Sequence, residues 1–167
     1  YALHEITYRA FARAAESDSL RRYPHLGIVV QAYAPGARTR LDEMHALAER
    51  RGAPVTIRLV KGAYWDYEVA HAEQRGLPPP VYTRKPDSDA NFERLTRRLL
   101  ERHDTLFPAF GSHNLRSLAH AIACARALEL SPRDYEIQVL HGMAEPLAHA
   151  LRDAGEHVRV YCPVGEL

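Results

Sequence analysis

Two kinds of hydrophobic pattern alternate along the chain. Short apolar stretches rich in β-branched residues, such as residues 26–33 and 55–61, predict strands that are buried on both faces. Between them lie longer charged segments whose apolar residues recur at every third or fourth position, which is the spacing of a helix with one buried face. This alternation indicates βα units around a parallel sheet.

The pattern places boundaries along the whole chain. Strands are expected at residues 26–33, 55–61, 106–110, 135–140 and 158–161. Helices are expected at residues 1–15, 37–51, 66–75, 89–103, 114–129 and 146–153. Gly52 suits a helix stop, Asp87 or Ser88 suits the cap of the helix at 89–103, and Pro146 suits the first turn of the last helix.

Five parallel strands fit either an open doubly wound sheet or a (β/α)8 barrel. The dinucleotide fingerprint GxGxxG is absent, which argues against the open sheet. Polar residues recur near the strand ends, where barrel enzymes place their sites: Gln31, Arg58, Ser112, Gln138 and Tyr161. We therefore predict an α/β fold, a partial (β/α)8 TIM-like barrel with about five strands and their helices. A full barrel takes about 250 residues, so a chain of 167 residues without an initiating Met is expected to be a fragment.

Charge and composition narrow the function. The chain has 22 Lys and Arg against 21 Asp and Glu, a net charge of +1 that argues against a nucleic-acid partner. No apolar stretch reaches the roughly 18–20 residues of a membrane span, and no signal peptide is recognisable. The pair of cysteines, Cys124 and Cys162, suits a reducing compartment. The ten histidines lack the spacing of a metal motif, so we expect no metal site.

One stretch combines a charge, a glycine and aromatic residues. Arg58 lies inside an otherwise apolar strand. Its guanidinium either reaches solvent or a structural carboxylate, or binds the carboxylate, phosphate or electron-rich ring atom of a ligand. Lys61-Gly62-Ala63-Tyr64-Trp65 follows at once. The glycine allows a ligand to approach the backbone, and the aromatic rings suit a ring-bearing cofactor. The alternative is a strand-to-helix turn with a core tryptophan.

Further polar residues follow other strands. Ser112-His113-Asn114 opens a helix and is either an anion site or a plain helix cap. Gln31 and Gln138 carry amides that face a ligand or contacts inside the barrel. No nucleophile or acid–base pair stands out, which favours a bound anionic cofactor that carries the chemistry. Flavin fits Arg58 and the 112–114 segment, whereas pyridoxal phosphate could use Lys61 as its Schiff-base lysine.

The stretch RLVKGAYW at residues 58–65 resembles the most distinctive motif of the proline dehydrogenase barrel, especially in bifunctional proline utilization A proteins. Further segments match in the same order: GIVVQAY at 27–33, VYTRK at 81–85, SHN at 112–114, QVLHGM at 138–143 and YCPVG at 161–165. The resemblance implies an FAD-dependent enzyme that oxidises L-proline to 1-pyrroline-5-carboxylate by hydride transfer to flavin N5. Electrons would then pass to a membrane quinone.

The resemblance also assigns residues to roles. Arg58 is expected at flavin N5 as the catalytic cation. The other expected flavin contacts are Gln31, Val60, Lys61, Gly62, Ala63, Trp65 and Gln138. Thr83 and Lys85 are expected at the adenylate end, and Ser112, His113 and Asn114 at the diphosphate and ribityl part. The proline ring is expected to be enclosed by Tyr64, Leu140 and Tyr161.

Several family features fall outside this sequence. A substrate-side lysine and an active-site aspartate are expected upstream of Tyr1, and a paired-arginine helix with a nearby glutamate downstream of Leu167. Residues 1–167 are thus expected to be the central to C-terminal-strand part of the barrel, inactive alone. A fused aldehyde dehydrogenase module would add NAD, and the location is expected to be cytoplasmic or peripheral at the inner face of the membrane. The alternatives are an inactive barrel remnant and a phosphate-cofactor enzyme that uses Lys61.

Overall fold

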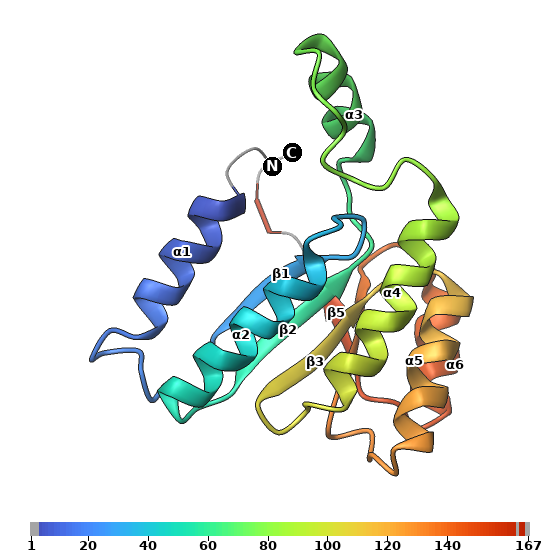
Figure 1. The fold of residues 1–167 in the computed structure, drawn as a ribbon. Helices are drawn as coiled ribbons and strands as arrows, with labels where there is room; N and C mark the ends of the chain where they lie inside the picture. The colour runs from blue at the N-terminus through green and yellow to red at the C-terminus, as the bar shows by residue number, and fades with distance from the viewer. Residues whose placement is uncertain (1–3, 163, 166–167) are drawn as a thin grey trace.

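The computed structural model describes residues 4–162 and 164–165, which form a parallel five-stranded sheet with helices (Figure 1). The strands are β1 (Gly27–Gln31), β2 (Val55–Val60), β3 (Leu106–Gly111), β4 (Glu136–Leu140) and β5 (Val158–Tyr161). Their order in the sheet is β1-β2-β3-β4-β5, the same as in the sequence. A doubly wound sheet reverses its strand order at a switch point, whereas a barrel does not. The expected partial barrel is therefore confirmed.

Helix α1 (His4–Ala15) precedes β1, and the other helices connect consecutive strands. They are α2 (Ala37–Arg51), α3 (Trp65–Gln74), α4 (Lys85–Leu100), α5 (Leu115–Ala127) and α6 (Glu145–Asp153). Figure 1 shows α2, α4 and α5 side by side over one face of the sheet, while α3 projects away from the end of β2. No helix in the described part of the chain is long and apolar enough to cross a membrane.

Alternation along β2 separates the two faces of the sheet. Val55, Ile57 and Leu59 are fully buried in the hydrophobic core, whereas Thr56, Arg58 and Val60 are half-buried on the opposite face. We call this opposite face the inner face, because in a barrel it points away from the surrounding helices. The core side of β2 is apolar and offers no partner for a guanidinium. Arg58 therefore lies on the inner face.

The register of the parallel strands brings the polar residues of the inner face into rows. Arg58 pairs across the sheet with Ala109, which in turn pairs with Glu136. The next row runs through residues from all strands: Gln31, Val60, Gly111, Gln138 and Arg159. At the end of the sheet Leu140 pairs with Tyr161. Residues far apart in the sequence thus meet at one end of the inner face.

The sequence misplaced the beginning of α4. The expected helix started at residue 89 with Asp87 or Ser88 as its cap, but α4 begins at Lys85 and both of those residues lie inside it. Pro86 explains the difference, since proline is well suited to the first helical turn, where its missing N–H costs nothing. The proposed cap is therefore wrong. Residues 1–3 of the first expected helix lie outside the described residues.

Candidate active site

Arg58 crosses one strand to reach its partner. Its Nε donates a hydrogen bond of 2.7 Å to Oε1 of Gln138, although Arg58 lies on β2 and Gln138 on β4. Gly111 on the intervening β3 makes room, because a Cβ there would lie 3.2 Å from Nη2 of Arg58. The guanidinium also lies over the Tyr161 ring, 5.7 Å from its centroid. These contacts hold a positive charge at the strand ends.

Gln31 offers a second donor on the inner face. Its side chain is buried, and Nε2 has no hydrogen-bond partner among the described residues. A buried amide without a partner costs roughly 1–3 kcal/mol, so it is expected to serve a group that binds there. The Nη nitrogens of Arg58 likewise make no hydrogen bond within the described chain. Together these donors suit an electron-rich acceptor ring.

A cavity of about 510 Å³ lies beside the end of β1. Gln31 lines it together with residues from α1, α2 and α3, including Tyr8, Arg40 and Glu68. None of the other predicted site residues belongs to its described lining. The cavity therefore adjoins the candidate site at Gln31 without containing the Arg58–Gln138 pair.

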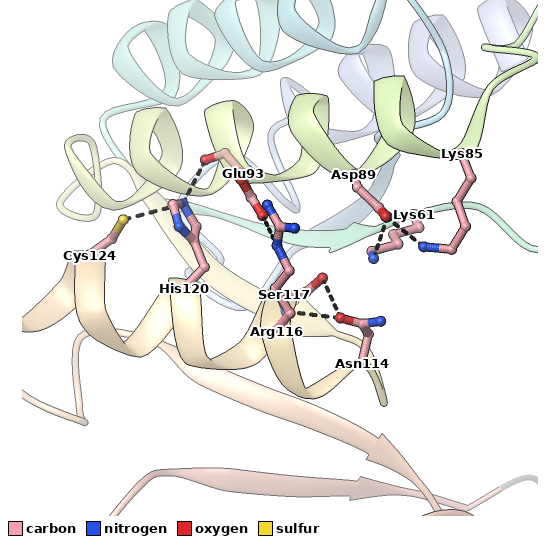
Figure 2. A network of polar contacts seen from close by, with 9 residues as sticks. All are labelled: Lys61, Lys85, Asp89, Glu93, Asn114, Arg116, Ser117, His120 and Cys124. Carbon is pink, nitrogen blue, oxygen red and sulfur yellow. Dashed lines mark hydrogen bonds and ion pairs between the residues drawn. The ribbon is translucent and has the colours of Figure 1, made fainter.

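The side chain of Lys61 points to α4 rather than to Arg58. Its Nζ donates to Oδ1 of Asp89 at 2.6 Å, and Nζ of Lys85 donates to Oδ2 at 2.5 Å (Figure 2). Burial alone raises the pKa of the Asp89 carboxyl, but both lysines outweigh burial and hold this pKa below its usual value. A Schiff-base lysine needs a neutral amine beside its ligand, so this ion pair gives no support to the pyridoxal phosphate alternative.

We expect Asp89→Asn to lower the free energy of unfolding by roughly 1 kcal/mol at neutral pH. Because the pKa of Asp89 is depressed in the folded state, its contribution is complete above the usual value of about 3.9 and disappears as the pH falls through the folded value. Urea unfolding at several pH values measures this loss. Asp87→Asn is the matched control, as Asp87 lies on the same helix and faces solvent more fully. A pH-independent difference would contradict the prediction.

Gly62 joins β2 to α3 in a conformation that other residues avoid. Its φ is +133°, and a Cβ would lie 2.3 Å from the Tyr33 ring. The loop is held further by Trp65, whose Nε1 donates to the carbonyl of Tyr82 at 2.8 Å, and by the Tyr82 N–H, which donates to the carbonyl of Tyr33 at 2.7 Å. The turn therefore carries Trp65 at a fixed place beside the strand ends.

Gly62→Ala is expected to destabilise the protein by about 1–3 kcal/mol from the backbone conformation, and by a similar amount from the clash with Tyr33. The midpoint of thermal unfolding measures the effect. Gly36→Ala serves as the control, because nothing lies within 4 Å of a Cβ at Gly36. Equal midpoints for the two variants would show that the turn relaxes freely.

The Ser112–Asn114 segment makes a helix cap. Asn114 Oδ1 accepts hydrogen bonds from the backbone N–H and the hydroxyl of Ser117, at 3.1 and 3.2 Å (Figure 2). Ser112 Oγ accepts from the N–H of Asn114, and Nε2 of His113 accepts from the N–H of Leu140 at 2.9 Å. The plain cap is thus present, and His113 ties it to β4. Binding of an anion by this segment stays a prediction.

Other predicted residues lie apart from Arg58 or at the surface. Tyr64 precedes α3 and is mostly exposed, and Thr83 is exposed just before Lys85, which begins α4. Val60 belongs to the inner face, whereas Ala63 lies in the turn after it. The structure therefore gathers Arg58, Gln138, Tyr161 and Gln31 at the strand ends, and places the proposed adenylate residues toward α4.

Sequence reasoning missed two charged residues of the site. Glu136 is buried, and both of its carboxylate oxygens accept hydrogen bonds from Arg159, the closest at 2.8 Å. Its Oε1 also accepts from Nε2 of Gln138 at 2.5 Å. The signal that singled out Arg58, a charge within an apolar strand, is also present at Glu136.

No cluster of three or more metal-ligating side chains occurs within the described residues.

A sequential parallel sheet with polar residues gathered at its strand ends defines part of a (β/α)8-barrel enzyme. Comparison with known families makes this specific. The family model described as proline dehydrogenase matches residues 1–167, and this chain belongs to that family. The resemblance to the proline dehydrogenase barrel, which the sequence motifs indicated, is thereby confirmed.

Several known proteins are similar to this chain. The bifunctional protein PutA of Salmonella typhimurium is 35% identical over 168 residues, covering 96% of this chain and 13% of that protein. PutA of Rhizobium meliloti is 40% identical over 84% of this chain and 12% of its own length. The crystal structure of proline utilization A from Bdellovibrio bacteriovorus, inactivated by N-propargylglycine, superposes with a TM-score of 0.97 at 43% identity. It covers all of this chain and 17% of that one. The chain thus spans about 13% of the length of the first PutA relative.

Proposed function

We propose that the protein containing this chain is an FAD-dependent proline dehydrogenase, which oxidises L-proline to 1-pyrroline-5-carboxylate. The observation that carries this proposal is the match of residues 1–167 to the family, joined to a cation held at the strand ends by Gln138. We infer that residues 1–167 form the central to C-terminal-strand part of its barrel.

The residues present fit a flavin. Its isoalloxazine ring is rich in acceptor atoms and gains negative charge on reduction, and Arg58 and Gln31 offer N–H groups that no described residue accepts. Gly111 leaves the room that the Arg58 guanidinium needs to extend across β3. When bound, the flavin supplies the hydride acceptor at N5. The protein supplies position and charge.

The chain's own residues divide this work. Arg58 holds a fixed positive charge beside the ring, and Gln31 and Gln138 orient the ring by hydrogen bonds from their amides. Val60, the backbone of Lys61, Gly62 and Ala63 line the cofactor, and Trp65 packs against it. Thr83 and Lys85 hold the adenylate end. Ser112, His113 and Asn114 bind the diphosphate and ribityl part.

The substrate is assigned to the end of the sheet. Leu140 and Tyr161 are paired across β4 and β5, and Tyr161 is already in contact with the Arg58 guanidinium. With Tyr64 they would enclose the proline ring and exclude water from it. This apolar enclosure beside the Arg58 cation would orient the proline ring toward a bound flavin, which would accept the hydride.

Partners follow from the same family membership. We propose a membrane quinone as the electron acceptor, reached by peripheral contact of a cytoplasmic protein with the inner face of the membrane. The PutA relatives are named bifunctional, which supports a fused aldehyde dehydrogenase module that would add NAD.

The full-length protein provides the test. Its visible spectrum is expected to show flavin bands that bleach when L-proline is added without oxygen, and recover when a quinone analogue follows. Flavin that L-proline does not reduce would favour an inactive barrel remnant. An aldimine band in place of flavin would favour the alternative that uses Lys61.

A further inference from the structure

Glu136 is a buried carboxylate in the middle of the site, and the proposed chemistry gives it no role. It lies on β4 in the same row as Arg58 and Ala109, and only 3% of its side chain is exposed. Burial alone raises the pKa of its carboxyl, but hydrogen bonds from Arg159 and Gln138 outweigh burial and hold this pKa below its usual value. A buried charge is costly, so its retention needs a reason.

The chemistry of its neighbours sets the orientation of one amide. A carboxylate only accepts hydrogen bonds, so the contact of 2.5 Å between Glu136 and Gln138 must come from the NH₂ group of Gln138. An arginine only donates, so the contact of 2.7 Å from Arg58 must reach the oxygen of Gln138. Glu136 and Arg58 thus require the same orientation of the Gln138 amide.

We propose that Glu136 is a positioning residue, which through Gln138 holds the Arg58 guanidinium in the orientation that serves the flavin, with Arg159 fixing Glu136. This inference rests on the proposed function. Arg159 can fix the Glu136 carboxylate, since both its Nε and its Nη2 donate hydrogen bonds to it. The four side chains form one chain of donors and acceptors from β5 to β2.

Replacing the Glu136 carboxylate by an amide allows the Gln138 amide to rotate into the opposite orientation. A glutamine at position 136 can present either an oxygen or an NH₂ group, and Arg159 competes for its single oxygen. When the NH₂ group faces Gln138, the Gln138 amide reverses and meets Arg58 with a donor instead of an acceptor. Arg58 then loses its only hydrogen bond to a described residue.

The direction in which each variant shifts the flavin midpoint potential distinguishes this role from a simple effect of charge. A held guanidinium stabilises the reduced, negatively charged flavin and raises its midpoint potential. If only net charge mattered, Glu136→Gln would raise the potential and Arg159→Gln would lower it. If Glu136 positions Arg58, both variants lower the potential, because both release the guanidinium.

The experiment uses the full-length holoprotein and three variants: Glu136→Gln, Arg159→Gln and Glu156→Gln. Glu156 is the matched control, a buried carboxylate that accepts from Arg126 and Tyr135 and contacts no site residue. Midpoint potentials are measured by dye-coupled titration, and FAD affinity by fluorescence titration of the apoprotein. We expect both site variants to lower the potential, weaken FAD binding about tenfold and slow reduction by proline about tenfold, with the control unchanged.

The outcomes distinguish the two proposals. If wild-type flavin is reduced by proline but Glu136→Gln raises the potential or matches Glu156→Gln, the positioning role is wrong and the proposed function stands. If wild-type flavin is not reduced, the proposed function is wrong and the positioning role falls with it. If Glu136→Gln does not fold, Arg159→Gln is judged by its FAD affinity and its rate of reduction by proline, because its potential falls in either case. The Arg159 side chain is mostly exposed, so this variant is expected to fold. Unchanged FAD affinity in that variant would refute the role.

Discussion

Arg58→Ala in the full-length protein is expected to slow flavin reduction by L-proline by about 10²–10³-fold. The guanidinium is the charge that the structure holds at the strand ends, fixed by Gln138 and placed over the Tyr161 ring. A charge that is already in position costs no reorganisation when negative charge develops on the ring. Its loss also leaves Oε1 of Gln138 without its donor. Anaerobic stopped-flow absorbance measures the rate.

Two further variants make this prediction specific. Arg58→Lys keeps the charge but loses the planar fork of donors, so we expect an intermediate rate. Arg116→Ala removes a cation of α5 that pairs with Glu93 (Figure 2). Arg116 is mostly exposed, so this variant should leave the rate unchanged. Flavin reduction at the wild-type rate in Arg58→Ala would show that Arg58 is not the catalytic cation.

The order and type of the elements were predictable from the sequence because each strand is a short apolar stretch and each helix has an apolar face. The end of β1 shows the limit. The sequence extended this strand to Tyr33, but β1 ends at Gln31, and the next residues only continue single backbone hydrogen bonds to Val60 and Lys61. Apolar character marks burial, and burial does not require a strand.

The candidate site was partly predictable. Arg58 stood out as a charge in an apolar strand. The direction of the Lys61 side chain was not predicted, although Lys61 lies two positions after the buried Leu59 and strand alternation therefore places it on the helix side. Its partner Asp89 lies 28 positions away on α4, where the sequence shows only another acidic helical residue. The partners of Glu136 were hidden for the same reason, since strand register decides them.

The loss of the Arg51 side chain is expected to destabilise the fold strongly. It ends α2 and is buried, and its guanidinium donates to the backbone carbonyls of Ala15, Leu20, Tyr23 and Pro54 at distances between 2.8 and 3.2 Å. These carbonyls belong to the end of α1 and the loop before β1 and to the turn before β2. Arg51→Ala should lower the free energy of unfolding by about 3–5 kcal/mol, because it leaves several carbonyls without a donor.

The neighbouring arginine supplies the control. Arg50 lies beside Arg51 on α2 but is mostly exposed, and it pairs with Glu16 at 3.0 Å, so Arg50→Ala should cost less than about 1 kcal/mol. Hydrogen exchange of residues 15–26 locates the effect within the full-length protein, since Arg51→Ala should release protection there first. Arg51→Lys should be intermediate, because one ammonium cannot span the carbonyls that a guanidinium reaches. Equal exchange in Arg50→Ala and Arg51→Ala would mean that the loop is held by its own turns, and that the buried guanidinium adds little to the fold.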